Sequence, residues 1–305
     1  MKPLIGVVTF GNIKYTKMCI QSILDSCDID IFSVIGKPDD QETEQYFNSL
    51  AYRLNYIKHS KNKGFPESIN DIYDYAFIDN DYDCVIIVGN DVLVYDDTFN
   101  KLFNYYPEYD WISATEVSVN ALFNQFPHTR HYFTDDEKRI FVMPEFNEWK
   151  YIELNQELKL YDLNKFNIVG DSHNCCLFSK RLFEKVGYID SAFYPAYFED
   201  NDYARRCQLL NIPMLRISNA YYFHFWSRTV HEVAEKKKHD KFFRANKEYY
   251  INKWGGEPGS EKYTIPFNSQ DFTFGSTIIP KTLKISERNP KIVEEFIDYV
   301  ESRRT

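Results

Sequence analysis

Three carboxylates gather at the start of a predicted helix in the segment YPAYFEDNDYARRCQLLNIP, residues 194–213. They belong to Glu199, Asp200 and Asp202, and apolar residues recur after them at helical spacing. Acidic residues in a first helical turn cap free N–H groups and suit the positive end of the helix dipole. A carboxylate held in this way can also accept a proton from a substrate hydroxyl. The segment therefore indicates either a capped helix or a general base, with Glu199 and Asp200 as the candidate bases.

A further acid interrupts the most hydrophobic run of the chain. The run YDCVIIVGNDVLVY, residues 82–95, predicts a buried strand that stops at Gly89, Asn90 and Asp91. An acid at this place is a suitable ligand for a hard divalent cation that also binds phosphate oxygens, although many such residues only cap turns. A later aromatic strand ends at His224. Asp91 and His224 together would suit Mn²⁺ or Mg²⁺ with a diphosphate, whereas a lone histidine in such a strand is commonly a core residue.

The elements that must position these residues alternate between strands and helices. Strands are predicted at 4–10, 29–36, 55–60 and 82–95, with helices at 14–26, 39–54 and 64–77. A strand and a glycine-stopped helix are predicted within 171–190, and LRISNAYYFHFWS predicts the strand that ends near His224. This alternation is typical of an α/β fold with an open, mostly parallel, Rossmann-like sheet that binds ligands at the carboxyl ends of its strands. The region from about 110 to 170 is expected to be irregular.

The simplest division of the chain falls at residue 235. We expect a main domain at 1–235 and a mostly helical C-terminal extension at 236–305, broken by glycine and proline in NKWGGEPGSEKYTIPF. The last predicted helix, PKIVEEFIDYVESRR at 290–304, has an apolar stripe. This stripe must pack either on its own domain or on a second subunit, so a homo-oligomer is one expectation.

The composition of the chain limits the kinds of partner that it can bind. The 305 residues carry a net charge of −9, and the only dense basic run is EKKKHDKFFR at 235–244. Nucleic acid is therefore a disfavoured partner, although this basic run does not exclude it. The six cysteines show no CxxC spacing, and we expect reduced thiols. We find no signal peptide and no apolar run long enough for a membrane span, and we predict a cytoplasmic location.

Several motifs occur in an order that resembles the inverting glycosyltransferases of family 2, which have the GT-A fold. They are IGVVTFGN, CIQSIL, NKGFPESINDIYDYA, VIIVGNDVLV and CCLFSKRLFEKVGYIDSAFYPAYFEDNDYARRC, within a resemblance that covers about residues 3–230. The last motif is the most specific, because in this family such a stretch supplies the catalytic base. The resemblance implies transfer of a hexose from a nucleotide-sugar donor to an acceptor hydroxyl, with inversion and with Mn²⁺ or Mg²⁺.

The resemblance also assigns roles by position. It implies that Asp91 and His224 bind the metal and that Asp200 is the general base beside Glu199. Asp202 is then expected to cap the helix, and Arg205 and Arg206 to keep Asp200 ionised. The expected donor-binding residues are Thr9, Phe10, Gly11, Asn62, Gly64, Asn70, Asn90 and Arg228.

Two departures from the family pattern concern the donor. Gly36 stands where the family commonly has an aspartate that recognises the nucleobase, with Asp39 and Asp40 a few residues later. Gly89 replaces the first carboxylate of the D-x-D-type motif. An alternative function is therefore a catalytically impaired GT-A scaffold that binds a glycan or a protein partner. Nucleotidyl transfer ranks last, because it would need a second metal-binding acid.

The acceptor is the least defined partner. We expect Trp149, Asp171 and His173 to bind it, because they lie in or beside the irregular region that should shape the acceptor cleft. A glycan, a polymer or another hydroxyl acceptor fits these residues equally. An anionic polymer would need the basic run at 235–244.

Overall fold

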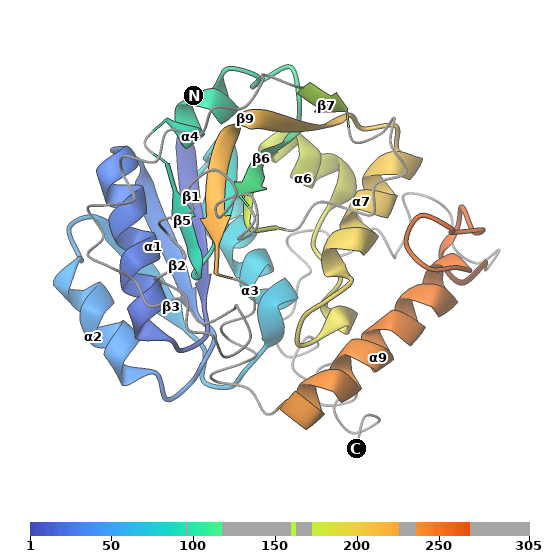
Figure 1. Cartoon of the computed structure of the whole chain (residues 1–305), viewed down its shortest axis with the longest axis horizontal. Helices are drawn as coiled ribbons and strands as arrows, with labels where there is room; N and C mark the ends of the chain where they lie inside the picture. The colour runs from blue at the N-terminus through green and yellow to red at the C-terminus, as the bar shows by residue number, and fades with distance from the viewer. Residues whose placement is uncertain (96, 118–159, 163–172, 226–235, 269–305) are drawn as a thin grey trace, which may run out of the picture.

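The computed structural model describes residues 1–95, 97–117, 160–162, 173–225 and 236–268, with only the backbone at 117, 160–162 and 236–239. Within them, nine strands form one sheet in the order β3-β2-β1-β4-β8-β6-β9-β5, and β7 pairs with β9 (Figure 1). The strands are β1 (Pro3–Thr9), β2 (Asp30–Ile35), β3 (Leu54–Lys58), β4 (Cys84–Gly89), β5 (Val92–Val94), β6 (Trp111–Val117), β7 (Leu160–Asp162), β8 (Cys175–Ser179) and β9 (Met214–His224).

The sheet is mixed but mostly parallel, as the alternating pattern predicts. Pairing in register gives one direction to β1, β2, β3, β4, β6 and β9 and the opposite direction to β5, β7 and β8. The carboxyl ends of β1, β2, β4 and β9 therefore meet at one edge of the sheet. In an open α/β sheet this edge is where ligands bind.

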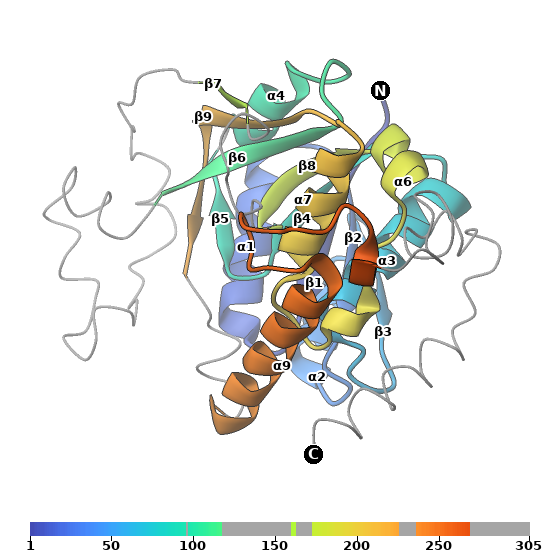
Figure 2. The ribbon, with the colours of Figure 1, turned by 90° about the vertical axis from the view of Figure 1, so that its right-hand side faces the viewer.

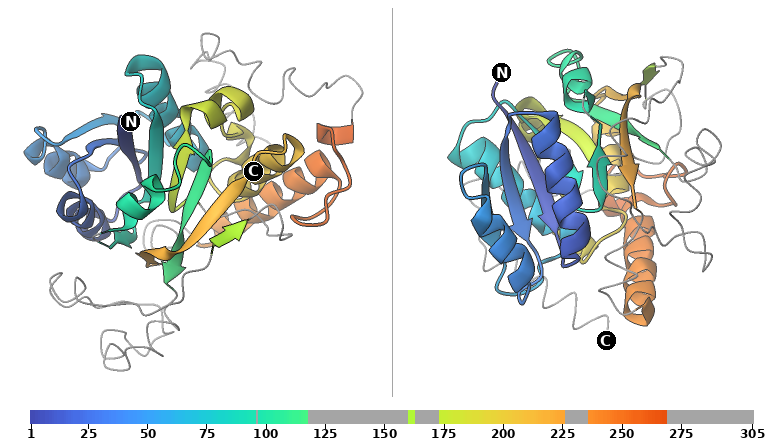
Figure 3. Two further views of the ribbon diagram at one scale, coloured as in Figure 1. Left: turned by 90° about the horizontal axis from the view of Figure 1, so that it is seen from above. Right: turned by 60° about the vertical axis from the view of Figure 1, so that its left-hand side comes forward.

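Helices cover both faces of the sheet (Figures 1 and 3). The helices are α1 (Ile13–Ser26), α2 (Gln41–Ser49), α3 (Gly64–Tyr73), α4 (Thr98–Phe103), α6 (Lys180–Val186), α7 (Glu199–Leu209) and α9 (Lys236–Trp254), with a π-helical segment η1 (Asp74–Asp79) and two 3₁₀ turns, η4 (Ser191–Phe193) and η5 (Pro266–Asn268). The apolar run in β1 explains this arrangement, because Leu4 and Val8 enter one core and Ile5 and Val7 enter the other. Successive strand residues point to opposite faces, so a strand buried on both sides must be apolar throughout.

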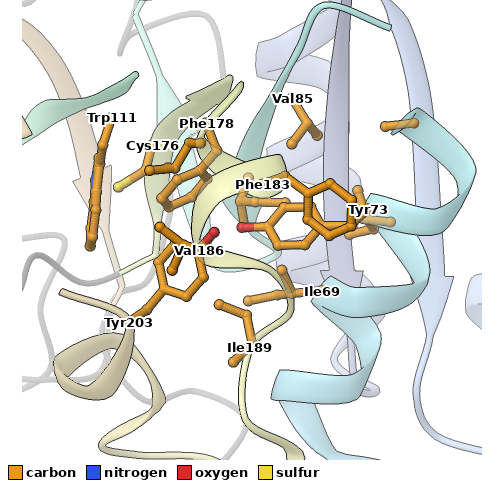
Figure 4. Close-up of a cluster of buried hydrophobic side chains, with 14 of the residues drawn as sticks. Ile69, Tyr73, Val85, Trp111, Cys176, Phe178, Phe183, Val186, Ile189 and Tyr203 are labelled. Atoms are coloured by element: carbon orange, nitrogen blue, oxygen red, sulfur yellow. The ribbon is translucent and has the colours of Figure 1, made fainter. Parts of the chain in front are cut away.

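The core beneath α3, α6 and α7 is rich in aromatic side chains (Figure 4). Tyr73 of α3 contacts Phe178 of β8 and Phe183 of α6 there, with ring centroids 6.3 Å and 5.4 Å apart. Tyr203 of α7 joins the cluster 5.9 Å from Phe178. The high aromatic content of the chain therefore serves this core in part.

The strand predicted in the run 82–95 stops at Gly89, as predicted, and a separate strand, β5, begins at Val92 and pairs with β9. The prediction for the next region is wrong. The chain from 110 is not irregular at its start, because β6 (111–117) pairs with β8 and β9. This error arises from long-range pairing, which a local sequence pattern does not contain.

The C-terminal helix α9 lies beside α7 (Figure 2). Its Tyr250 and Trp254 are fully buried in a cluster with Phe193 of η4. The division of the chain at 235 stays a prediction, and the helix predicted at 290–304 lies outside the described residues. All six cysteines are free thiols, as the absence of CxxC spacing predicts.

Candidate active site

Asp91 and His224 meet at the ligand-binding edge of the sheet. The chain leaves β4 at Asn90 and Asp91, and β5 then pairs antiparallel with β9 so that Val92 lies opposite His224. The amide N–H of Phe225 donates to the Asp91 carbonyl at 2.9 Å, which fixes the backbone of the acid. As a result Asp91 Oδ1 lies 3.2 Å from His224 Nε2.

This pair fits the divalent cation that the fold implies. Two ligands at right angles on a cation with bonds of about 2.1 Å lie about 3 Å apart, close to the separation seen here. Among the described residues, no group of three or more His, Cys, Asp or Glu side chains is arranged to hold a metal. Two protein ligands suffice when phosphate oxygens and waters complete the shell, as is usual for Mg²⁺.

Glu116 and Asn174 orient the His224 ring. Glu116 Oε2 and Asn174 Nδ2 each lie 3.3 Å from His224 Nδ1. Burial lowers the pKa of His224, but Asp91 and then Glu116 more than compensate and raise it to about 10. A carboxylate on the far nitrogen of a metal-binding histidine fixes its ring and tautomer. Sequence reasoning missed Glu116, because it assigned this strand to the irregular region.

The loop after β1 contacts the turn that carries Asp91. Asn90 Nδ2 donates to the Gly11 carbonyl at 3.4 Å and to Thr16 Oγ1 at 3.0 Å. On the other side, Asp40 Oδ2 accepts from the Gly11 amide at 3.2 Å, while its Oδ1 caps α2. Gly11 and Asn90 are thus brought together beside Asp91 and His224, and their donor-binding role stays a prediction.

Gly36 borders the same loop. Its amide donates to the Thr9 carbonyl at 2.8 Å. A Cβ atom at Gly36 would lie 3.3 Å from Phe10 Cδ2 and 3.3 Å from the Thr9 oxygen. Phe10 therefore takes up room that a side chain at 36 would need. Ser68 of α3 lies next to this point, and its hydroxyl donates to the Gly64 carbonyl at 2.9 Å.

The segment 62–65 contacts the loop before the acidic start of α7. Asn62 Oδ1 accepts from the Gly64 amide at 2.8 Å, so Asn62 shapes the turn itself. Gly64 has a φ of 84°, which favours glycine. The Phe65 amide donates to the Pro195 carbonyl at 2.7 Å, so this segment is in direct contact with the loop that leads to Asp200.

The start of α7 presents Asp200 without a capping side chain. Helix α7 begins after Phe198, whose φ is 70°, and Asp200 Oδ1 accepts from the Asn201 amide at 2.8 Å. Burial raises the pKa of Asp200 to about 6. Glu199 is buried, and burial together with Asp200 raises its pKa well above the usual range. The pKa of each acid is thus raised, which favours the protonated form, and the Asp200 carboxyl titrates close to neutral pH.

The expected capping role of Asp202 is wrong. Asp202 is fully buried, and its Oδ2 accepts from Arg206 Nε at 3.0 Å. Its Oδ1 accepts from Trp254 Nε1 at 2.9 Å and from Lys253 Nζ at 2.6 Å. Arg205 instead donates to a backbone carbonyl of residue 263, so in the described structure neither arginine pairs with Asp200. The cause of the error is α9, whose partners for Asp202 lie some fifty residues further along the chain.

Two predicted site residues are packed inside the protein. Asn70 Nδ2 donates to the Ile189 carbonyl at 2.9 Å and its Oδ1 accepts from the Ile189 amide at 2.8 Å. His173 is 2% exposed, and its ring lies 5.6 Å from Trp111 and 5.1 Å from Phe178. Three further predicted residues lie outside the described ranges: Trp149, Asp171 and Arg228.

The aromatic side chains nearest to Asp200 in the chain were not among the predicted acceptor residues. Tyr197 and Phe198 are half-buried, and each ring centroid lies 5.3 Å from that of Phe243 on α9. Phe243 is 40% exposed. The sequence signal for this cluster is the aromatic run before Glu199. That run does not indicate that Phe243, on a distant helix, is its partner.

Solved glycosyltransferase structures share this mixed sheet flanked by helices. A mannosyltransferase from Pyrobaculum calidifontis, PcManGT, in complex with GDP-Man and Mn²⁺, has a TM-score of 0.53 and 10% identity over 85% of this chain and 67% of its own. GalNAc-T7 with UDP, GalNAc and Mn²⁺ has a TM-score of 0.55 and 9% identity over 98% of this chain and 57% of its own. These likenesses establish the fold.

The family itself follows from the sequence. The family model for "Glycosyl transferase family 2" matches residues 4–187, more than half of the chain, so the protein belongs to family 2 of the glycosyltransferases. No curated protein matches it at a significant level. None of the helices in the described residues is long and apolar enough to cross a membrane.

Proposed function

We propose that this glycosyltransferase is an inverting, metal-dependent hexosyltransferase that uses a nucleotide-sugar donor. The observation that carries the proposal is the pairing of Asp91 with His224 at the edge of the sheet, 3.2 Å apart, in contact with the loop after β1. The structural neighbours that contain GDP-Man, or UDP and GalNAc, each with Mn²⁺, support a donor and metal of the same kind.

Asp91 and His224 would hold Mn²⁺ or Mg²⁺, which when bound supplies positive charge to the diphosphate of the donor. Glu116 holds the His224 ring so that Nε2 faces Asp91. The loop residues Gly11 and Asn90 line the donor side of this pair. The protein thereby contributes a fixed electrostatic environment for the leaving group, and such preorganised charge commonly accounts for most of an enzyme's rate acceleration.

Asp200 would take the proton of the acceptor hydroxyl. The acceptor oxygen forms its bond to the anomeric carbon as the bond from that carbon to the diphosphate oxygen breaks, which inverts the centre. Glu199 stays protonated where Asp200 is ionised, because its pKa is raised by burial and by Asp200. A single negative charge on this acid pair would therefore direct the proton transfer to Asp200.

The acceptor is a glycan, a polymer or another hydroxyl compound. We place the reaction in the cytoplasm on the basis of the six free thiols. A homo-oligomer through the C-terminal region remains part of the proposal.

The test is a panel of nucleotide sugars with and without Mn²⁺, measured by thermal protection and by donor hydrolysis. Wild type is compared with Asp200→Asn, which keeps the size of the side chain, and with Asp91→Asn. We expect metal-dependent protection by one donor in wild type and in Asp200→Asn, with turnover lost in the latter. Protection without any turnover in wild type would favour the binding scaffold. No protection by any donor would refute the donor site.

A further inference from the structure

The loop that leads to Asp200 has an unusual backbone immediately before the acid pair. Tyr197 has a φ of 82° and Phe198 a φ of 70°, both in the left-handed region that side chains rarely adopt. Such conformations persist only where the surroundings fix them. Helix α7 has no capping side chain of its own, so other residues must supply the restraint.

Asn246 of α9 supplies it at the middle of the loop. The side chain is fully buried, and Nδ2 donates to the carbonyls of Phe193 at 2.8 Å, Ala196 at 2.7 Å and Tyr197 at 3.3 Å. An asparagine side-chain amide has two N–H donors, and these three carbonyl acceptors occupy both of them. One side chain thus holds the backbone on both sides of residues 194 and 195 and reaches the first left-handed residue.

Lys253, two turns further along α9, connects the two ends of the same loop. Its fully buried Nζ lies 2.7 Å from Asp190 Oδ2 and 2.6 Å from Asp202 Oδ1. Tyr249 and Trp254 add hydrogen bonds to the same acids, at 3.1 Å to Asp190 and 2.9 Å to Asp202. The loop 190–202 is therefore attached to α9 at its start, its middle and its end.

We propose that α9 is a brace that fixes the direction of Asp200, with Asn246 and Lys253 as positioning residues. Neither touches the reacting groups: both act through the backbone and the acids of the loop 190–202. The brace lies beyond residues 4–187, the part of the chain that matches the family, so it is a feature that the family match does not contain. The catalytic consequence rests on the proposed role of Asp200 as base.

The experiment removes the amide donors and measures the loop and the reaction separately. Asn246→Leu keeps the branched shape of the side chain without a donor, and Asn246→Ser is smaller, keeps one donor and serves if the larger leucine fails to fold. Tyr250→Phe is the matched control, because it removes a buried hydroxyl from the same helix, where it donates to Glu261 at 2.5 Å and not to the loop. Hydrogen exchange of the amides at 194–202 is followed against those of β4.

We expect exchange at 194–202 to rise at least about tenfold in Asn246→Leu while β4 is unchanged, since loops open locally when their restraints are lost. With the donor identified above, kcat should fall about 100-fold, because small displacements of a catalytic group cost this much, while the KM for the donor changes less than about twofold. The exchange rates and kcat of Asn246→Ser should lie between those of wild type and Asn246→Leu. Tyr250→Phe should match wild type in both.

Unchanged exchange in both Asn246 variants would overturn the brace, as would an equal effect of Tyr250→Phe. Increased exchange with unchanged kcat would also overturn it, because the loop would then not control Asp200. If wild type transfers no sugar from any donor, the proposed function has failed, and the exchange measurement alone decides whether α9 holds the loop.

Discussion

Replacing His173 by leucine should remove a large part of the protein's sensitivity to acid. The ring is buried among aromatic side chains, and within the described residues neither of its nitrogens has a hydrogen-bond partner. Burial, and then the nearby charge of Arg206, lowers the pKa of His173 from 6.5 to about 3. The folded protein therefore holds a neutral imidazole at pH 5, whereas the unfolded chain binds a proton there.

The magnitude follows from this difference. A folded-state pKa below the unfolded value gives stability that is complete above pH 6.5 and is lost as the pH falls toward 3. At pH 5 the medium lies 1.5 units below the unfolded pKa of 6.5, so the loss is about 2 kcal/mol at 1.36 kcal/mol per unit. Leucine has no group that binds a proton, so His173→Leu should not show this loss of stability.

The assay is urea unfolding of wild type and His173→Leu at pH 8 and pH 5. At pH 8 both states of the wild type carry a neutral ring, so the difference between the two proteins there reflects packing alone and serves as the reference. We expect the free energy of unfolding to fall between pH 8 and pH 5 by about 2 kcal/mol more in wild type than in the variant. Equal losses would show that the ring is hydrated or paired, and the reasoning would be refuted.

Three further outcomes are expected. Transfer rates should rise tenfold per pH unit below about 6 and level off above it, because Asp200 must be ionised to act as base and burial raises its pKa to about 6; a rate independent of pH between 5 and 7 would contradict this. Lys253→Met should cost about 3–5 kcal/mol in urea unfolding, since it leaves Asp202 with one buried partner fewer; a cost below 1 kcal/mol would contradict it. Gly64→Ala should lower the melting temperature and weaken protection by the donor, because its Cβ would lie 2.8 Å from Tyr194 at a φ of 84°; unchanged melting would show that the turn adapts.

The first half of the fold was predictable from the sequence, because its signals are local. Short continuous apolar runs marked β1, β2 and β4, and the helical spacing marked α1 to α3. The same reasoning located Asp91, since an acid after a buried parallel strand lies at the ligand-binding edge of the sheet. His224 followed in the same way from the end of β9.

The remaining features depend on contacts between distant segments. Glu116 reaches His224 only because β6 pairs in parallel with β9, a hundred residues later in the chain. Asp202 looked like a capping residue because its buried partners on α9 gave no local signal. His173 lay beside a predicted cleft in sequence but inside the aromatic core in space. Side chains whose role is set by a partner far along the chain are those that local patterns misassign.

The contact between α7 and α9 has a consequence for where the chain can be cut. Its interior holds two acids, Asp190 and Asp202, and two bases, Arg206 and Lys253, whose formal charges cancel. A fragment that ends at residue 235 would lack Lys253, which leaves Arg206 alone against two acids, and it would lack Tyr250 and Trp254, which are fully buried against Phe193. We therefore expect the smallest fragment that folds to extend at least to Trp254, with charge balance and apolar cover together setting that limit.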